Sequence, residues 1–393
     1  MIVKMCCNAQ ILSNFFKIHK RFSRSKKYRL KNMFKCGRNA VKHDRLVKHQ
    51  GNYIFNSFLP PLNSPAFLNM AMQVPGEGTD FFENFYKGKR LAPISAYIAV
   101  TGKCRYNCWH CSANKSIGQN ELNTKPLIRI IGKLQDLGVG IVGFTGGEPL
   151  LREDLEQIIA SVDQQKSMSL VFSTGYGLTL GRAVGLKSAG LFGIAFSLDS
   201  IHKEKHDRMR GYPGAYDHSL KAIRNAKKAG LYTMSQTVCT RELMASGEIL
   251  ALAKMLRQEG IDEMRILEPL PCGKLSGSNP ALLSLSEQKD LKNLHITLNG
   301  DLQYPKASVF PYFESADQFG CGAGSQHSYV DTAGNFGPCD FLEHRYGNLL
   351  TDDIKEVWLK MHKAVGRPKC TCFAKNPNQC NNTLPKYYRL LEG

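Results

Sequence analysis

The stretch TGKCRYNCWHCS, from Thr101 to Ser112, places three cysteines within one short loop. Cys104, Cys108 and Cys111 have the spacing C-x3-C-x2-C, directly after the strand-like run ISAYIAV. Three thiolates at this spacing can hold three irons of a [4Fe-4S] cube and leave the fourth iron open for another ligand. Zinc is the alternative, although it favours paired C-x2-C units and a fourth Cys or His.

A regular alternation of strand-like and helical patterns begins just before this loop. The predicted strands are 96–101, 140–145, 167–173, 193–198, 231–238 and 263–268, with amphipathic helical patterns between them. Such an alternation predicts an α/β protein with parallel βα units, wound into a partial (β/α)6 barrel of the TIM type. Chemistry in such barrels lies on the loops that follow the strands, which is where the cysteine loop falls.

The second predicted strand is followed by Gly146, Gly147, Glu148 and Pro149. Glycines allow the backbone to approach a ligand closely, and a carboxylate beside them can accept a hydrogen bond from an ammonium group. Gly-Gly-acid-Pro is by itself also an ordinary turn. Its position some thirty residues after the three cysteines makes it a candidate part of the same site.

Polar side chains also follow the third and fourth predicted strands. The third strand ends in FSTGYG, which contains Ser173. Ser197 and Asp199 in FSLDS share one strand face because they are two residues apart. All three can hydrogen-bond a polar ligand such as a ribose. Arg210, in HDRMRGYPGAYD, is either a carboxylate ligand or a surface arginine.

A second group of cysteines lies near the C-terminal end. Its members are Cys321, Cys339, Cys370, Cys372 and Cys380. The segment between Cys339 and Cys321 is typical of a hairpin, with Gly334 and Asn335 at its turn. Five thiolates saturate one [4Fe-4S] cube and cannot saturate two, and a structural zinc site is the alternative.

Together these motifs resemble the radical S-adenosylmethionine (SAM) enzymes that carry a C-terminal SPASM or twitch extension. The resemblance implies that Cys104, Cys108 and Cys111 hold a [4Fe-4S] cluster whose open iron binds SAM. It also assigns SAM contacts to Gly146, Gly147, Glu148, Ser173, Ser197, Asp199 and Arg210, with substrate as an alternative partner for Asp199. One auxiliary [4Fe-4S] cluster is implied at Cys321, Cys339, Cys380 and one of Cys370 or Cys372.

The same resemblance implies a function. Members of the family cleave SAM reductively to a 5′-deoxyadenosyl radical, which abstracts hydrogen from an unactivated C–H bond. An electron donor such as ferredoxin or flavodoxin is expected. Modification of a peptide or protein is the first expectation for this chain, with a tetrapyrrole side chain of the haem pathway or a lipid as the alternative. A non-catalytic iron-sulfur electron carrier is the hypothesis from another class.

Charge is concentrated in the first fifty residues. They contain fourteen Lys or Arg and a single acid, Asp44, out of a net charge of +19 for the 393 residues. ILSNFFKIHKRF would form a helix with an apolar stripe and a basic face, which suits peripheral contact with an anionic membrane. A solvated tail, an organellar presequence and a nucleic-acid-binding arm remain alternatives.

The chain therefore divides into four predicted parts: a basic arm (1–50), a lead-in segment rich in Pro and Gly (51–93), a partial barrel (94–300) and a cysteine-rich extension (301–393). No apolar run is long enough for a membrane span, and no secretory signal is evident. Eight of the thirteen cysteines fall into the two groups, which indicates metal ligation in a reducing cytoplasm rather than a disulfide framework.

Overall fold

The structure, a computed structural model, describes residues 7–22, 43–78, 80, 84–85, 88–113, 121–277 and 280–375. Its strands are β1 (Val47–His49), β2 (Asn52–Ile54), β3 (Ser95–Thr101), β4 (Ile141–Gly146), β5 (Met168–Ser173), β6 (Gly193–Ser197), β7 (Tyr232–Val238), β8 (Glu263–Leu267), β9 (Lys306–Val309), β10 (His327–Val330), β11 (Asn335–Gly337) and β12 (Gly347–Asn348).

The α-helices are α2 (Ala9–Phe22), α4 (Pro65–Met72), α6 (Thr124–Leu137), α7 (Leu155–Ala160), α8 (Leu180–Ser188), α9 (Lys203–Arg210), α10 (Ala215–Lys228), α11 (Arg241–Ala245), α12 (Glu248–Gln258), α13 (Leu285–Gly300), α14 (Phe310–Phe313) and α15 (Ile354–Val365). Short 3-10 turns are η2 (Pro149–Leu151), η3 (Gly273–Leu275) and η4 (Phe373–Lys375).

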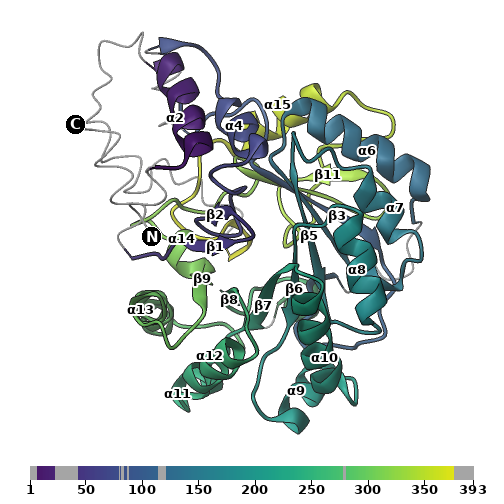
Figure 1. The fold of residues 1–393 in the computed structure, drawn as a ribbon, viewed down its shortest axis with the longest axis vertical. Helices are drawn as coiled ribbons and strands as arrows, with labels where there is room; N and C mark the ends of the chain where they lie inside the picture. The colour runs from purple at the N-terminus through teal and green to yellow at the C-terminus, as the bar shows by residue number, and fades with distance from the viewer. Residues whose placement is uncertain are drawn as a thin grey trace.

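One ten-stranded sheet organises the described residues, in the order β12-β11-β10-β3-β4-β5-β6-β7-β8-β9 (Figure 1). The six predicted strands correspond to β3 through β8, and each pairs in parallel with the next. The predicted α/β fold with a partial barrel is confirmed. Two further parallel strands were not foreseen: β9 beside β8, and β10 beside β3. Among the described strands β9 pairs only with β8, so the sheet stays open on this side.

Two hydrophobic clusters occupy the two faces of the curved sheet. The larger lies between the strands and the outer helices, which Figure 1 shows along one side as α6, α7, α8 and α10. The smaller fills one end of the barrel interior and includes Ile54, Leu170, Tyr232 and Met234. Ile54 comes from β2, so the β1–β2 hairpin closes that end of the barrel. Strands buried on both faces explain the continuous apolar runs of the sequence.

The N-terminal helix α2 packs on α4 instead of standing free. Ile11 is buried, and the fully buried Asn14 donates to the carbonyls of Leu62 and Ser64 at 3.0 and 3.1 Å. Part of the predicted apolar stripe is therefore used inside the protein. Leu12 and Phe16 remain 53% and 69% exposed. Most of the remaining basic arm, residues 23–42, lies outside the described residues.

The C-terminal part of the chain extends the sheet. β10 and β11 form the predicted antiparallel hairpin, with Gly334 at a positive φ of 86° in its turn. β10 then pairs in parallel with β3, the strand that precedes the cysteine loop. The second cysteine group is thereby attached directly to the barrel.

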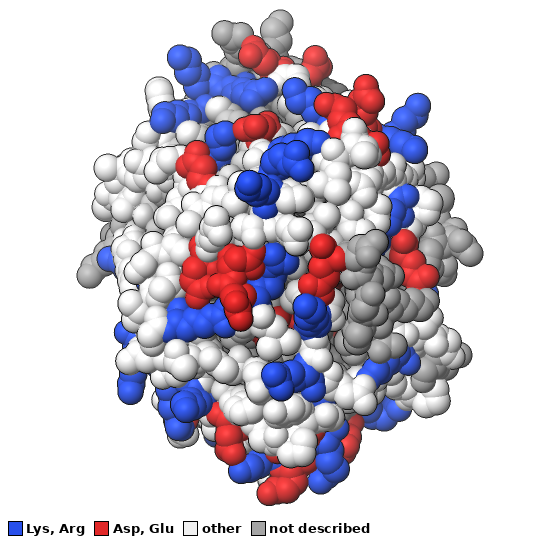
Figure 2. All heavy atoms as spheres, turned by 90° about the vertical axis from the view of Figure 1, so that its right-hand side faces the viewer, with Lys and Arg blue, Asp and Glu red and all other residues white. Residues whose placement is uncertain are grey.

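Charged side chains are intermixed on the face that Figure 2 presents, which is the side of the outer helices. Lysines and arginines there alternate with small groups of aspartates and glutamates. That face lacks the continuous basic surface typical of nucleic-acid binding. Among the described helices, none combines the length and apolar character needed to cross a bilayer.

A buried ion pair ties the N-terminal segment to the last barrel strand. The carboxylate of Asp44 contacts the ammonium of Lys306 on β9, and both side chains are inaccessible to solvent. Removing one partner leaves an unpaired buried charge, so Asp44→Asn should lower the free energy of unfolding by about 3–5 kcal/mol. Urea unfolding followed by circular dichroism measures this change.

The exposed pair of Lys166 and Asp136 provides the control, and Asp136→Asn should cost less than about 1 kcal/mol. The double variant Asp44→Asn/Lys306→Met should recover part of the loss, because it removes both charges. Equal effects of Asp44→Asn and Asp136→Asn would contradict the structural role of the buried pair.

Candidate active site

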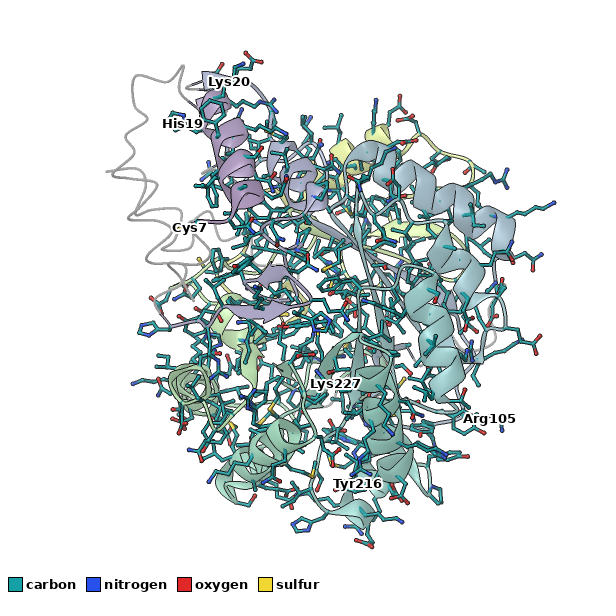
Figure 3. The ribbon with its side chains drawn as sticks, viewed as in Figure 1. Cys7, His19, Lys20, Arg105, Tyr216 and Lys227 are labelled. Carbon is teal, nitrogen blue, oxygen red and sulfur yellow. The ribbon has the colours of Figure 1, made fainter. Side chains whose placement is uncertain are left out.

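The cysteine loop follows β3 and is held in place by backbone hydrogen bonds to the end of α9. The amides of Asn107 and Trp109 donate to the carbonyls of Arg210 and Met209 at 3.0 and 3.2 Å. Cys104, Cys108 and Cys111 are free, half-buried thiols. Figure 3 shows Arg105 of this loop at the periphery of the molecule, and its guanidinium lies 5.1 Å from the centre of the Tyr176 ring.

The electrostatics of the loop fit a metal cluster. Burial raises the pKa of the Cys104 thiol to about 11, and the neighbouring carboxylate of Glu148 adds to this effect. A thiolate at this position therefore needs a cationic partner, and iron would supply the charge. His110, which lies between Cys108 and Cys111, is largely buried, and this burial lowers its pKa to about 4.

The Gly-Gly-Glu segment lies against the backbone that leads into the cysteine loop. The amides of Gly147 and Glu148 donate to the carbonyls of Thr101 and Lys103, both at 2.7 Å. A Cβ atom on Gly146 or Gly147 would lie 2.1 Å from one of these carbonyl oxygens. Only glycine fits at either position, so the two predicted motifs are joined by direct backbone contact.

Glu148 connects the ends of β4 and β5. Its buried carboxylate accepts from the Ser173 hydroxyl at 2.7 Å and from the amide and hydroxyl of Thr174, both at 2.6 Å. The amide of Leu150 adds a fourth hydrogen bond at 3.0 Å. Burial raises the pKa of Glu148 despite these donors. Ser173, which was predicted as a SAM contact, donates a hydrogen bond to Glu148 in this structure.

Asp199 and Arg210 form a buried ion pair beneath the cysteine loop. Their atoms Oδ2 and Nη2 are 2.6 Å apart, and Asp199 also accepts from the amide of Val238 at 2.9 Å. Arg210 Nη1 lies 3.9 Å from the Cys108 sulfur. Asp199 therefore neutralises Arg210, and Arg210 in turn contacts the cysteine loop. Contact of either residue with SAM or substrate stays a prediction.

His206 is a buried neighbour of this pair that the sequence reasoning did not single out. Its Nδ1 accepts from the amide of Asp199 at 3.1 Å, and burial lowers its pKa to about 4. The signal was present in HDRMRG, where the histidine lies one helical turn before Arg210. Ser197, the last residue of β6, uses its carbonyl to accept from the Ser219 hydroxyl at 2.9 Å.

The second cysteine group forms two clusters of possible metal ligands. In one, ligand atoms of Glu314, Cys321 and Cys372 lie within 4.8 Å of one another. In the other, His327, Cys339 and Asp340 do so. Three of these residues, Glu314, His327 and Asp340, were absent from the sequence analysis. The structure therefore groups Cys372 with Cys321, whereas the sequence left open whether Cys370 or Cys372 belongs there.

Two thiols of this group share a hydrogen bond. Cys372 donates to Cys321, which lowers the pKa of Cys321 to about 7. Cys370 is buried nearby, and Cys380, the predicted fourth ligand, lies outside the described residues. Buried thiols beside a carboxylate fit iron-sulfur or zinc ligation by their chemistry.

A cavity of about 510 Å³ lies inside the curved sheet, beside the second cysteine group. Its wall includes Phe15 and Ile18 of α2, Tyr97, Thr145, Phe172, Gln236 and Arg265 of the barrel, Phe310 and Phe313 of α14, and Cys321, Cys339 and Cys372. Thr145 directly precedes Gly146, so part of the cavity wall adjoins the Gly-Gly-Glu segment. Its volume is in the range of small-molecule sites.

Comparison with known proteins identifies the chemistry. Residues 98–264, which run from β3 into β8, match the family model of the Radical SAM superfamily. The chain therefore contains a radical SAM domain. Proteins of this family use a [4Fe-4S] cluster and SAM, and the similar curated proteins are enzymes, which removes the hypothesis of a non-catalytic electron carrier.

Among curated relatives, the AdoMet-dependent heme synthase of Nitratidesulfovibrio vulgaris is 25% identical over 295 residues, covering 68% of this chain and 80% of that protein. The Fe-coproporphyrin III synthase of Methanosarcina barkeri is 31% identical, covering 50% of this chain and 49% of that protein. Among solved structures, Streptococcus suis SuiB bound to its precursor peptide SuiA has a TM-score of 0.58 at 17% identity, covering 84% of this chain and 76% of SuiB. The similarity to SuiB shows a shared fold alone.

Gly147→Ala tests the backbone contact between the two motifs. Its added Cβ would lie 2.1 Å from the carbonyl oxygen of Lys103, so the cysteine loop must shift. We expect SAM affinity to fall at least tenfold in anaerobic equilibrium dialysis of reconstituted protein, because displacement of one loop misaligns the site.

Gly181→Ala is the matched control, because Gly181 lies on α8 with open space around the added methyl group. SAM affinity of this variant should equal that of the wild type. Unchanged SAM binding in Gly147→Ala would show that the Gly-Gly-Glu segment and the cysteine loop need no close contact.

Proposed function

We propose that this radical SAM enzyme acts on a tetrapyrrole that bears carboxylate side chains, and that it abstracts hydrogen from one of those side chains. When bound and reduced, the [4Fe-4S] cluster together with SAM supplies a 5′-deoxyadenosyl radical for this step. The observation that carries the proposal is the cavity of about 510 Å³, which begins beside Thr145 and has many aromatic side chains in its wall.

The chain's own residues would divide the work in the following way. Cys104, Cys108 and Cys111 would hold three irons of the cluster, because they are the thiols of the loop that follows β3. Gly146 and Gly147 would let SAM approach the backbone. Glu148, buried and already holding Ser173 and Thr174, would fix the shape of that edge. The Asp199–Arg210 pair would support the loop from below.

The size and apolar character of the cavity support a broad, flat substrate. Phe58, Phe172, Phe310 and Phe313 all contribute to its wall. Aromatic faces of this kind stack well on a macrocycle. The sequence analysis put peptide modification first and the tetrapyrrole second. Similarity to a heme synthase along most of the length of both chains reverses that order in our proposal.

Peptide modification is the second candidate. The fold is shared with SuiB, whose structure contains a precursor peptide, and that likeness extends over most of this chain. A peptide would have to reach the same cavity, since Thr145 joins it to the predicted SAM site. The two candidates therefore differ in the substrate and share the site.

An auxiliary iron-sulfur cluster of the SPASM or twitch type is a further part of the proposal. Cys321, Cys339 and Cys372 line the cavity on the side away from the first loop. A cluster there would face the substrate and could accept an electron from it. Ferredoxin or flavodoxin would serve as the external electron donor.

Production of 5′-deoxyadenosine tests the function. Anaerobically reconstituted protein with dithionite and SAM should form it, and iron coproporphyrin III should increase the rate at least tenfold over a peptide mixture. Substrate binding excludes water and completes the site, which explains the increase. Stimulation by peptides alone would reject the tetrapyrrole proposal.

The control is the variant with Cys104, Cys108 and Cys111 all replaced by Ala. It should form no 5′-deoxyadenosine and should retain about four irons per chain from the auxiliary cluster. Zero irons would reject the auxiliary cluster, and eight would show that the ligand assignment of both sites is wrong.

Peripheral membrane contact through α2 is also proposed. The exposed Leu12 and Phe16 could enter the interface while lysines of the helix face anionic lipid. Leu12→Ser/Phe16→Ser should weaken co-sedimentation with phosphatidylserine vesicles at least fivefold, since it removes the inserted apolar surface. The double variant Leu285→Ser/Leu302→Ser, at exposed leucines elsewhere, is the control. Equal sedimentation of both variants and wild type would reject the proposal.

A further inference from the structure

Arg265 is a buried cation that faces the cavity. It lies in the middle of β8, and its side chain contributes to the cavity wall together with Tyr97, Phe172 and Gln236 from three other strands. The whole residue is only 1% exposed. Most arginines reach the surface with their charged ends, so a guanidinium held inside a barrel needs a physical reason.

Three aromatic rings enclose the guanidinium of Arg265. Its central carbon lies 4.9 Å from the centre of the Phe172 ring and 5.1 Å from the centres of the Phe58 and Phe310 rings. The rings come from the lead-in segment, from β5 and from the start of α14. Such packing orients a flat cation firmly, and it supplies no acceptor in the plane of the N–H groups.

The polar partners of Arg265 are few and neutral. Nη1 donates to the Ser57 hydroxyl at 2.9 Å, and Nη2 approaches the Tyr97 hydroxyl at 3.4 Å. Nε has no hydrogen-bond partner. Among the described residues, none offers a carboxylate oxygen within 4.0 Å of this guanidinium, in contrast to the paired Arg210 and Lys306.

An acidic group, Glu263, is linked to this charge only through the hydroxyl of Ser57. Ser57 Oγ donates to Glu263 Oε1 at 2.8 Å while it accepts from Arg265. Glu263 is already held by the Ser57 amide and by the Tyr232 hydroxyl at 2.9 Å. Glu263 is absent from the cavity wall, whereas Arg265 contributes to it, as do Lys89 and Arg90.

We propose that Arg265 binds a carboxylate of the substrate at the inner end of the cavity. A buried guanidinium without an anion is costly, and an entering carboxylate would satisfy its free N–H groups in the two-pronged geometry that arginine favours. The three rings would pack on the apolar body next to that carboxylate. Arg265 would thus select apolar molecules that carry an acid group and would fix their orientation below the SAM site.

This inference rests on the proposed function for the identity of the substrate, and the test separates the two. The probes are metal-free coproporphyrin III, its tetramethyl ester, and laurate, which is an apolar carboxylate without a macrocycle. Binding of the porphyrins is followed by the shift of their absorption band in anaerobic titrations of the reconstituted protein. Binding of laurate is followed by calorimetry.

Arg265→Gln should weaken coproporphyrin III binding ten- to hundredfold, because a charge-assisted hydrogen bond is lost. The tetramethyl ester should bind the wild type and this variant equally. Arg265→Lys should recover only part of the affinity, since lysine lacks the planar fork. Lys89→Gln is the matched control: Lys89 is an exposed cation at the cavity wall, and its loss should change affinity less than twofold.

The remaining outcomes decide between the carboxylate anchor at Arg265 and the tetrapyrrole substrate. If laurate binding depends on Arg265 while porphyrins do not bind, the carboxylate anchor stands and the tetrapyrrole proposal fails. If Arg265→Gln weakens the acid and the ester equally, or if no probe depends on Arg265, the anchor is rejected. Circular dichroism and iron content of each variant show whether it has folded, and a misfolded Arg265→Gln is replaced by Arg265→Met, which retains the packing.

Discussion

The close contact of two backbone segments is the constraint on which the site depends. Gly146 to Glu148 lies so near Thr101 to Lys103 that neither glycine could carry a side chain. Two hydrogen bonds of 2.7 Å fix this contact. Because the second segment leads directly into the cysteine loop, the position of the loop is set by β4. Glu148 then passes the same constraint to β5 through Ser173 and Thr174, so three strand ends behave as one unit.

The open side of the sheet explains where the cavity lies. A closed barrel would fill its interior with side chains, as the β1–β2 hairpin and its neighbours do at one end. On the open side, α14 follows β9, and the segment with Cys321 precedes β10, so both ends of the sheet contribute walls to one space. Cys321, Cys339 and Cys372 therefore lie at the wall of the same cavity as the side chains of β3, β5, β7 and β8. Their distance along the sequence from these strands gives no sign of this proximity.

The barrel and its motifs could be predicted because local signals and tertiary needs agree there. Strands such as MSLVFS are buried throughout and mostly apolar because both faces are covered, and the glycines of GGEP answer a local backbone requirement. Other features could not be foreseen. The pairing of β10 with β3 depends on a contact between residues more than two hundred positions apart. The sequence of α2 predicts an interfacial helix. In the structure the helix also packs on the protein, because Asn14 donates hydrogen bonds to two backbone carbonyls that the sequence pattern could not reveal as partners.

Among the candidate site residues, too, some could be predicted from the sequence and others could not. Ser173, Asp199 and Arg210 lie near the expected place, yet each has a protein partner that spacing could not reveal. Glu314, His327 and Asp340 were missed because acidic and histidine ligands carry no spacing signal comparable to that of cysteine.

Three of the buried cations show how the interior uses charge. Lys306 is neutralised by Asp44, and Arg210 by Asp199, so each of these pairs joins two segments of the fold. Arg265 has the same degree of burial and only hydroxyl partners. If all three served stability alone, the third would be expected to carry an acid as well, because an uncompensated charge opposes folding. Arg265 lies at the cavity, where a ligand could bring the missing anion. Its burial is then explained by ligand binding, whereas Lys306 and Arg210 already have acidic partners within the protein.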